Sequence, residues 1–325
     1  MNDMIEFGRF NEVEKIGKGT QGDVYEIPEG MFIESVQVKI AIKKYNESIL
    51  AGKAGAIENH IRSLIRDRDD AIPDIKRIID RHTTWPRYLV SENGKMCGFA
   101  MSLIPDAFYA YYEGYNSMVR TLSQFEFIIN DDDMRRHLNL PIINDVGRAK
   151  IVYDLLLIIK TLHEYNYVIG DISSTNIIIY IDPENQRRNR ALFIDVDSFR
   201  KVLESIEQPQ SPSYRPPESI YALRAYERVM ETNKSRYDGQ KYLVQSFVQN
   251  KESDVYKIGL VILRLYHIGP RRSLIYRSSN AMNRLENEIG LDFANLIKGS
   301  LSDSAARPTA LELFRVFVEA YNLKC

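Results

Sequence analysis

The pattern of hydrophobic and polar positions changes about one third of the way along the chain. Up to Ile104, apolar and polar residues alternate in short runs rich in β-branched side chains, a period of two that is typical of strands. Asn93-Gly94 separates two of these runs and predicts a tight hairpin turn. One stretch, 54–66, predicts a helix. The predicted strands are 13–17, 23–27, 36–45, 88–90 and 96–104.

After Pro105 the period becomes that of helices. In the first predicted helix the apolar positions are spaced by three and four. These positions are Val152, Leu155, Leu156, Ile159 and Leu162. Asp145 is placed to cap the start of this helix. Further helices are predicted at 255–266 and from Thr309, where Glu312 completes a capping box.

A β-rich first third and an α-rich remainder predict an α+β fold with two lobes and a cleft between them. We expect a small lobe at 1–104, holding a sheet and one helix, and a larger helical lobe at 105–325. One β-hairpin is predicted within the second lobe, at 176–180 and 191–196. Together the two lobes would form one domain.

Charge and composition exclude several classes of protein. The formal net charge is −1, which gives no reason to expect bulk electrostatic binding to nucleic acid or to membranes and leaves a local basic patch as the alternative. The longest apolar stretch, 151–162, is too short and too polar to span a bilayer. Cys97 and Cys325 form no disulfide framework, and the first residues carry no apolar signal core. These features predict a cytoplasmic protein.

The first chemical motif is a glycine-rich turn between two predicted strands. Residues 16–24 fit the pattern G-x-G-x-x-G-x-V with Gly17, Gly19, Gly22 and Val24. A turn without side chains lets backbone N–H groups approach phosphate oxygens. A dinucleotide-binding loop would continue into a helix, whereas a strand follows here, which favours the loop type that covers ATP.

A lysine follows at the distance that such a loop requires. Lys43 ends the strand that contains Ala41, about twenty residues after the glycines. Its ammonium group is suited to hold the α- and β-phosphates if a carboxylate fixes its position. Glu58, on the next predicted helix, is the candidate carboxylate; the alternative is that Glu58 is a solvated helix residue.

Two acidic motifs follow the long helix. Asp171 and Asn176 are five residues apart, as in D-x-x-x-x-N, where the aspartate accepts a hydroxyl proton and the asparagine holds a metal ion. Asp195 and Asp197 then end the next strand, where a carboxylate can bind Mg²⁺. Asp195 is favoured because the apolar strand leads directly into it, and Asp197 remains the alternative.

The order of these motifs resembles the protein kinase superfamily over nearly the whole chain. Residues 214–218, Tyr-Arg-Pro-Pro-Glu, are similar to the A-P-E segment, and 253–259 are similar to the D-x-W-S-x-G start of the central helix. Arg307 matches the arginine that pairs with the A-P-E glutamate. The resemblance therefore implies an ion pair between Glu218 and Arg307.

The resemblance implies ATP and Mg²⁺ (or Mn²⁺) as cofactors and serine or threonine of a protein as acceptor. Asp171, Lys43 and Glu58 would be catalytic, and the metal would be held by Asn176 with Asp195 or Asp197. Met101 and Leu103 would lie at the hinge that meets adenine. The implied nucleotide-binding residues are Gly17, Gly19, Gly22, Val24, Ala41, Lys43, Met101 and Leu103.

Several positions depart from the family pattern. Gly170 stands where H-R-D has its arginine, which argues against activation by a phosphorylated loop. Ser173 replaces the lysine that neutralises the γ-phosphate, and D-F-G is absent as such. The interval from Glu218 to Asp254 is 36 residues, longer than in ordinary kinases. Its helix-like part, 221–237, is interpreted as a surface helix in preference to a docking surface.

Finer details resemble an atypical bacterial branch of the superfamily. They are Trp85-Pro86, the segment 98–101, Gly170-Asp171 and the segment 195–199. Members of that branch are associated with PP2C-type phosphatases and helix-hairpin-helix segments. The resemblance thus implies a protein substrate, the chain itself included, and a PP2C-type phosphatase as a partner.

Three functions fit these motifs. A serine/threonine protein kinase is favoured by the motif order and by the Glu218 and Arg307 positions. A kinase of small molecules, similar to aminoglycoside or choline kinases, is favoured by the Gly-Asp pair and the missing lysine. A pseudokinase that only binds nucleotide is the third alternative, because the arginine, the lysine and D-F-G are all replaced.

Overall fold

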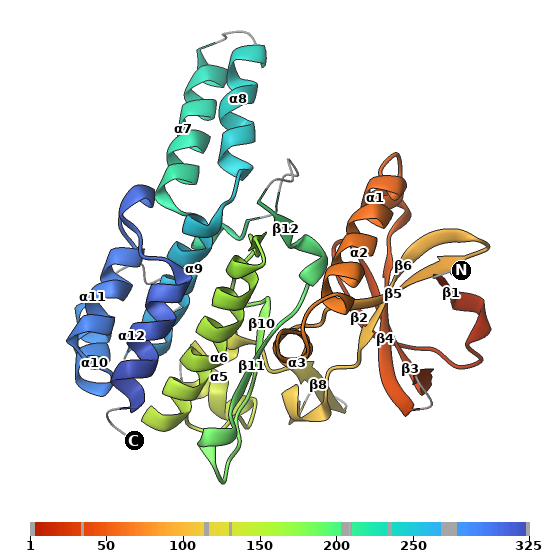
Figure 1. Ribbon diagram of the computed structural model, residues 1–325, viewed down its shortest axis with the longest axis horizontal. Coiled ribbons are helices and arrows are strands. Elements are labelled where there is room, and N and C mark those ends of the chain that lie inside the picture. Colours follow the sequence, from red (N-terminus) through yellow and green to blue (C-terminus); the bar gives the residue numbers. More distant parts are fainter. Residues whose placement is uncertain are drawn as a thin grey trace. The chain divides into compact units, whose positions relative to one another are not determined.

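The computed structural model describes residues 4–33, 36–113, 117–129, 132–202, 208, 210–232, 236–267 and 278–322. The chain is α+β, as the sequence predicted. It divides into two compact units: unit 1 comprises residues 1–106 and 195–197, and unit 2 comprises 107–194 and 198–325. Figure 1 shows the elements coloured along the chain.

Unit 1 is built on a six-stranded sheet in the order β1-β5-β6-β4-β3-β2. Its strands are Met4–Glu6 (β1), Glu14–Lys18 (β2), Gly22–Ile33 (β3), Val36–Tyr45 (β4), Pro86–Glu92 (β5) and Lys95–Ser102 (β6). Neighbouring strands pair antiparallel, except β1 with β5. Asn93 and Gly94 both have positive φ, 53° and 72°, so the predicted hairpin turn is confirmed.

Three helices accompany this sheet, so the prediction of one helix in the first third is wrong. They are Glu47–Leu50 (α1), Ala54–Asp69 (α2) and Pro73–His82 (α3). The predicted helix corresponds to α2. The missed helix α3 begins at a proline, whose fixed φ suits the first helical position. Trp85 donates from Nε1 to the carbonyl of Leu64 (2.8 Å), which fixes α2 against the start of β5.

The strand registers assign each side chain to a face of the sheet. Ile40 and Ile42 of β4 are fully buried in the hydrophobic core of one face. Ala41, Lys43 and Tyr45 alternate with them and therefore lie on the opposite face. The site residues of β4 are thus backed by a packed core.

The described part of unit 2 contains three two-stranded sheets. They pair Tyr109–Glu113 (β7) with Met118–Leu122 (β8), Tyr167–Val168 (β9) with Arg200–Lys201 (β12), and Ile177–Tyr180 (β10) with Arg190–Phe193 (β11). The β10–β11 hairpin is the one predicted from the sequence. Short 3₁₀ helices in the chain are Phe7–Arg9, Asp106–Phe108, Gln186–Arg188, Val196–Ser198, Pro212–Tyr214 and Ser304–Ala306.

Helices make up most of unit 2. They are Phe125–Ile129 (α4), Asp132–His137 (α5), Asp145–Glu164 (α6), Pro217–Glu231 (α7), Arg236–Phe247 (α8), Lys251–Tyr266 (α9), Ser279–Glu288 (α10), Leu291–Ser300 (α11) and Ala310–Asn322 (α12). The cap of α6 is Asn144, whose side chain accepts from the N–H of Gly147 (2.8 Å), and not Asp145 as predicted. The capping box of Thr309 and Glu312 is confirmed.

The centre of unit 2 is α9, which is buried from Ser253 to Tyr266 on all sides. The long interval after Glu218 folds as two helices, α7 and α8, which lie side by side as a hairpin (Figure 1). The stretch 221–237 is therefore divided between two helices. Among the described residues, no helix combines the length and the apolar character needed to cross a bilayer.

The predicted ion pair of Glu218 and Arg307 is confirmed. Arg307 donates from Nη1 and Nη2 to the two carboxylate oxygens of Glu218, at 2.7 and 2.8 Å. It also bonds to the carbonyls of Ser302 and Glu252. The guanidinium group of Arg307 therefore connects the start of α7, the start of α9 and the segment before α12.

Replacing Arg307 by alanine is expected to lower the free energy of unfolding by about 3 kcal/mol. The guanidinium is fully buried, so its loss leaves Glu218 and two carbonyls without their donors. Urea unfolding followed by circular dichroism measures the change. Arg315→Ala, on the exposed side of α12, is the control and should change stability by less than about 0.5 kcal/mol. Equal effects of the two substitutions would contradict the assigned role.

Candidate active-site residues

The glycine-rich motif forms the hairpin between β2 and β3. Gly19 donates from its N–H to the carbonyl of Gly22 (2.8 Å), which closes the turn. A Cβ at Gly22 would lie 2.2 Å from the carbonyl oxygen of Lys44, so the neighbouring strand excludes any side chain there. A strand follows the turn, as predicted. Gly19 is exposed, whereas Gly17 is half-buried and packs against the side chain of Val24.

Four predicted nucleotide-binding residues share one face of the sheet. Ala41 and Lys43 lie two apart on β4, and residues that are paired across antiparallel strands project to the same side. Val24 pairs with Lys43, and Met101 pairs with Ala41, so both belong to this face. Leu103 follows β6 and donates from its N–H to the carbonyl of Lys39 (3.1 Å).

Lys43 is buried and surrounded by oxygen atoms. Its ammonium group lies 2.8 and 3.0 Å from the two carboxylate oxygens of Asp197, 3.1 Å from Asp195 Oδ1 and 3.4 Å from Gln21 Oε1. Burial lowers the pKa of Lys43, but the attraction of Asp197 and then Asp195 outweighs it, so the pKa lies above its ordinary value. Lys43 is therefore a cation.

Both carboxylate oxygens of Asp197 form hydrogen bonds within this cluster. Its side chain is only 4% exposed, and besides Lys43 it accepts from the hydroxyl of Tyr45 (2.8 Å). Burial raises the pKa of Asp197, and the charge and hydrogen bonds of Lys43 together with that of Tyr45 bring it below its usual value. The sequence reasoning missed Tyr45, although its position two residues after Lys43 on the same strand was a usable signal.

Asp195 differs from Asp197 in both backbone and exposure. Its φ is +58°, a left-handed conformation that is uncommon for a residue other than glycine. Its side chain is 51% exposed, and one oxygen lies 3.1 Å from Lys43. A non-glycine residue in this region costs about 1–3 kcal/mol of strain and is often found at functional sites. The two aspartates therefore have different environments: Asp197 is enclosed and Asp195 is accessible.

Glu58 does not meet Lys43 in this structure. It lies on α2 and accepts from Nε and Nη2 of Arg62 one helical turn later, at 3.1 and 2.9 Å. The ammonium of Lys43 is instead surrounded by Asp197, Asp195 and Gln21. The predicted pair of Lys43 and Glu58 is thus replaced by a pair of Lys43 and Asp197, because the Asp-Val-Asp turn brings two carboxylates to the end of β4.

In unit 2 the structure brings Asp171 and Asn176 together. Asn176 donates from Nδ2 to the main-chain carbonyl of Asp171 (3.0 Å) and to its Oδ2 (2.9 Å). Ser211 donates to Asp171 Oδ1 from both its backbone N–H (3.0 Å) and its hydroxyl (2.9 Å). The carboxylate of Asp171 is therefore held in one orientation, with a serine hydroxyl at hydrogen-bonding distance.

The turn before Asp171 is held from two sides. Asp254 accepts from the backbone N–H groups of Ile169 (2.7 Å) and Gly170 (2.8 Å). Gln208 donates from Nε2 to the carbonyls of Val168 (3.1 Å) and Ile169 (3.4 Å). Gly170 has φ +78°, and a Cβ there would lie 2.5 Å from Gln208 Nε2. The sequence reasoning did not single out Gln208, because a lone glutamine carries no motif.

Replacing Gly170 by alanine is expected to lower the free energy of unfolding by about 1–3 kcal/mol. The new side chain would occupy a left-handed conformation and displace Gln208 from its carbonyl partners. Thermal unfolding measures the effect. Gly55→Ala within α2, where a Cβ has no neighbour within 4 Å, should instead stabilise by about 0.5–1 kcal/mol. A neutral Gly170→Ala would refute this account of the turn.

Asn176 and Asp195 are linked through the chain. Ile194 donates from its N–H to the carbonyl of Asn176 (3.0 Å), and Asp195 is the next residue. The amide nitrogen of Asn176 is used by Asp171, so Oδ1 is the atom that faces away from that carboxylate.

These donors fit a nucleotide-bound Mg²⁺. Magnesium is commonly held by one or two carboxylates together with substrate phosphates, and it prefers oxygen ligands. Asp195 in unit 1 has an accessible carboxylate, and Asn176 in unit 2 has an amide oxygen; each side chain is a ligand of this kind. Within the described ranges, no group of three or more His, Cys, Asp and Glu side chains is placed to hold a metal ion.

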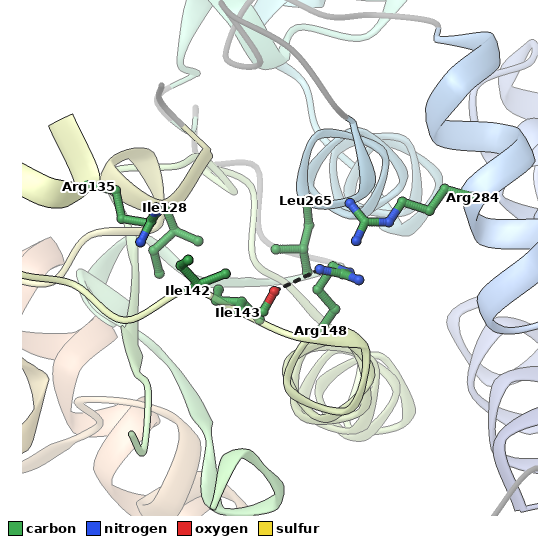
Figure 2. Close-up of a pocket in the computed structure, with 7 residues that line it drawn as sticks. All are labelled: Ile128, Arg135, Ile142, Ile143, Arg148, Leu265 and Arg284. Atoms are coloured by element: carbon green, nitrogen blue, oxygen red, sulfur yellow. Dashed lines mark hydrogen bonds between the residues drawn. The ribbon is translucent and has the colours of Figure 1, made fainter. Parts of the chain in front are cut away.

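A separate pocket of about 160 Å³ in unit 2 is rich in arginine (Figure 2). It is lined by Ile128, Arg135, Ile142, Ile143, Arg148, Leu265 and Arg284. Glu288 accepts from Arg148 at 3.1 and 2.8 Å and also from Arg284, and Asp145 bonds to Arg148. Carboxylates of the protein thus neutralise two of the arginines, and we interpret this cluster as a structural ion-pair network.

No model of a known protein family matches the chain, and no curated protein matches it. The function is therefore argued from the motifs and the contacts around Lys43, Asp171, Asp195 and Asp197.

Proposed function

We propose that this protein is an ATP- and Mg²⁺-dependent phosphotransferase, and that its acceptors are serine or threonine hydroxyls of proteins. The observation that carries the proposal is the cluster of Lys43 with Asp195 and Asp197. These residues are more than 150 positions apart in the chain, and motif order alone placed them in one site. A lysine cation beside two carboxylates that follow the β10–β11 hairpin supplies groups that can bind phosphate and a metal ion.

The chemistry assigns one role to each group. The backbone of the glycine hairpin and the Lys43 ammonium hold the nucleotide phosphates. Bound Mg²⁺, held by Asp195 and Asn176, would neutralise charge on the phosphate oxygens. The acceptor hydroxyl oxygen forms a bond to the γ-phosphorus, its proton passes to Asp171, and the bond from the γ-phosphorus to the β,γ-bridging oxygen breaks to release ADP.

The Asp171 environment supports the role of a base. Ser211 places a hydroxyl 2.9 Å from Asp171 Oδ1, which is the distance that proton transfer from an acceptor requires. Asn176 fixes the other oxygen. An incoming serine or threonine hydroxyl would take the same kind of hydrogen bond.

The ion pair of Glu218 and Arg307 favours a protein acceptor over a small molecule. It stabilises the segment that follows Ser211 and the start of α7, next to the hydroxyl contact with Asp171.

A pseudokinase is the second candidate, and a specific contact favours it. Ser173, in place of the expected lysine, bonds to the hydroxyl of Thr175 (3.0 Å) and brings no positive charge.

Acceptor profiling separates the candidates. The protein is incubated with ATP labelled at the γ-phosphate and with Mg²⁺ or Mn²⁺. The acceptors offered are the protein itself, a generic protein substrate, and a set of amino and hydroxyl metabolites. We expect phosphoserine or phosphothreonine. Labelled metabolite alone would support the small-molecule kinase, and ATP binding without any transfer would support the pseudokinase.

A further inference from the structure

Lys257 is a buried cation beneath the turn that carries Asp171. It lies on α9, one helical turn after Asp254, and it is 0% exposed. Its ammonium group donates to the main-chain carbonyl of Gly170 and to Oε1 of Gln249. The sequence analysis gave it no role, because a lysine on a helix is usually solvated.

Lys257 completes the hydrogen bonding of the turn. Asp254 accepts the N–H groups of Ile169 and Gly170, and Gln208 donates to the carbonyl of Ile169. The carbonyl of Gly170 accepts from the ammonium of Lys257 and from the backbone N–H of Ile172 (3.0 Å). Two side chains of α9 therefore hold the backbone before Asp171. The carboxylate of Asp254 binds its N–H groups, and the ammonium of Lys257 binds a carbonyl.

The burial of this amine does not stabilise the fold. Burial lowers the pKa of Lys257 to about 8, although Asp254, Asp171 and Glu218 raise it. Arg215 lowers it further. A lysine whose pKa is lower in the folded state binds fewer protons there than in the unfolded chain, so stability rises with pH from about 8 towards the ordinary lysine value. Near neutral pH the charge therefore destabilises the fold.

We propose that Lys257 is a positioning residue for phosphate transfer, whose charged amine holds the Gly170 carbonyl and thereby sets the orientation of Asp171. This inference rests on the proposed function. It also accounts for Gly170, which stands where the H-R-D motif has an arginine. Side chains of α9 and Gln208 hold this turn, so an arginine at position 170 is not needed to hold it. Loss of the proton from Lys257 removes the charge from the hydrogen bond that fixes the turn.

The test compares the pH dependence of transfer in wild type and in Lys257→Met. We expect wild-type kcat to fall as the pH rises through about 8. Lys257→Met should lower kcat at pH 7 by about 10-fold to 100-fold, because small displacements of a catalytic group have effects of this size. It should also abolish the alkaline fall and leave the KM for ATP within about twofold of wild type.

Two further variants keep the result decisive. Lys298→Met removes an exposed lysine of α11 and should leave kcat and the pH profile unchanged. Gln249→Leu removes the second acceptor of Lys257, so the alkaline fall should move to lower pH. If Lys257→Met does not fold, the pH profile of Gln249→Leu decides. An alkaline fall of kcat at lower pH than in wild type supports the proposal, and an unchanged pH profile contradicts it. A folded Lys257→Met with the wild-type rate and profile would overturn the proposal.

Hydrogen exchange separates this inference from the proposed function. If the wild type transfers no phosphate, the proposed function fails, but the hold of Lys257 on the turn is still measurable. The peptide that contains Ile169, Gly170 and Asp171 should exchange at least about fivefold faster in Gln249→Leu or Lys257→Met than in wild type. Equal exchange rates would refute the positioning role.

Discussion

Replacing Asp171 by asparagine is expected to lower kcat by about 10²–10⁴-fold and to leave the affinity for ATP within about twofold. Asparagine has the shape of aspartate but accepts no proton from the attacking hydroxyl. It can still accept from the N–H and hydroxyl of Ser211. Its new NH₂ group, however, would face the donor Nδ2 of Asn176, which now bonds to Asp171 Oδ2.

The matched control is Asp182→Asn. Asp182 also lies in a loop of unit 2, where it accepts the N–H groups of Glu184 and Asn185 (both 2.9 Å). Asparagine forms the same kind of turn, so kcat should change by less than about twofold. Initial rates of phosphate transfer at saturating ATP measure both variants. A wild-type rate for Asp171→Asn, with intact binding, would exclude Asp171 as the base.

The second prediction divides the roles of Asp195 and Asp197. Asp197→Asn should lower the free energy of unfolding by about 3 kcal/mol, because it removes the buried counter-ion of Lys43. It should also weaken ATP binding by about tenfold or more, since Lys43 would no longer be held by Asp197 and Tyr45 together. Urea unfolding and titration with a fluorescent ATP analogue measure the two effects.

Asp195→Asn should behave differently. The side chain is half exposed, so its pair with Lys43 contributes less than about 1 kcal/mol to stability. Asparagine also tolerates the left-handed backbone at this position. We expect kcat to fall by about 100-fold or more at millimolar Mg²⁺, with a raised Mg²⁺ requirement and near-normal stability. If Asp197→Asn raises the Mg²⁺ requirement and Asp195→Asn does not, the assignment is reversed.

Much of the fold was predictable from local patterns. Alternation along 36–45 located β4, and Asn93-Gly94 located the β5–β6 turn, because strand period and turn chemistry are local properties. Helix α3 was predictable but missed: Pro73 at its start and the spacing of Ile75, Ile78 and Ile79 by three and four are both helix signals. The α6 cap was displaced by one residue because Asn and Asp are equally good caps and stand side by side.

The site was predictable where it depends on spacing within a motif. Asp171 and Asn176 meet because they are five positions apart in one loop. The partner of Lys43 was not predictable in this way, because Glu58 and Asp197 both lie outside the motif of Lys43 and only tertiary packing decides between them. Lys257 was missed for the same reason: the sequence does not show that all sides of α9 are buried.

The measurement that tests the central assignment most directly is a crystal structure with a non-hydrolysable ATP analogue and Mg²⁺. We predict Mg²⁺ at about 2.1 Å from an Asp195 oxygen and from Asn176 Oδ1. The Lys43 ammonium should contact the α- and β-phosphates, and Asp197 should remain bonded to Lys43 and Tyr45. A structure in which neither Asp195 nor Asp197 coordinates the metal, or in which the phosphates do not approach Lys43, would contradict the proposed function.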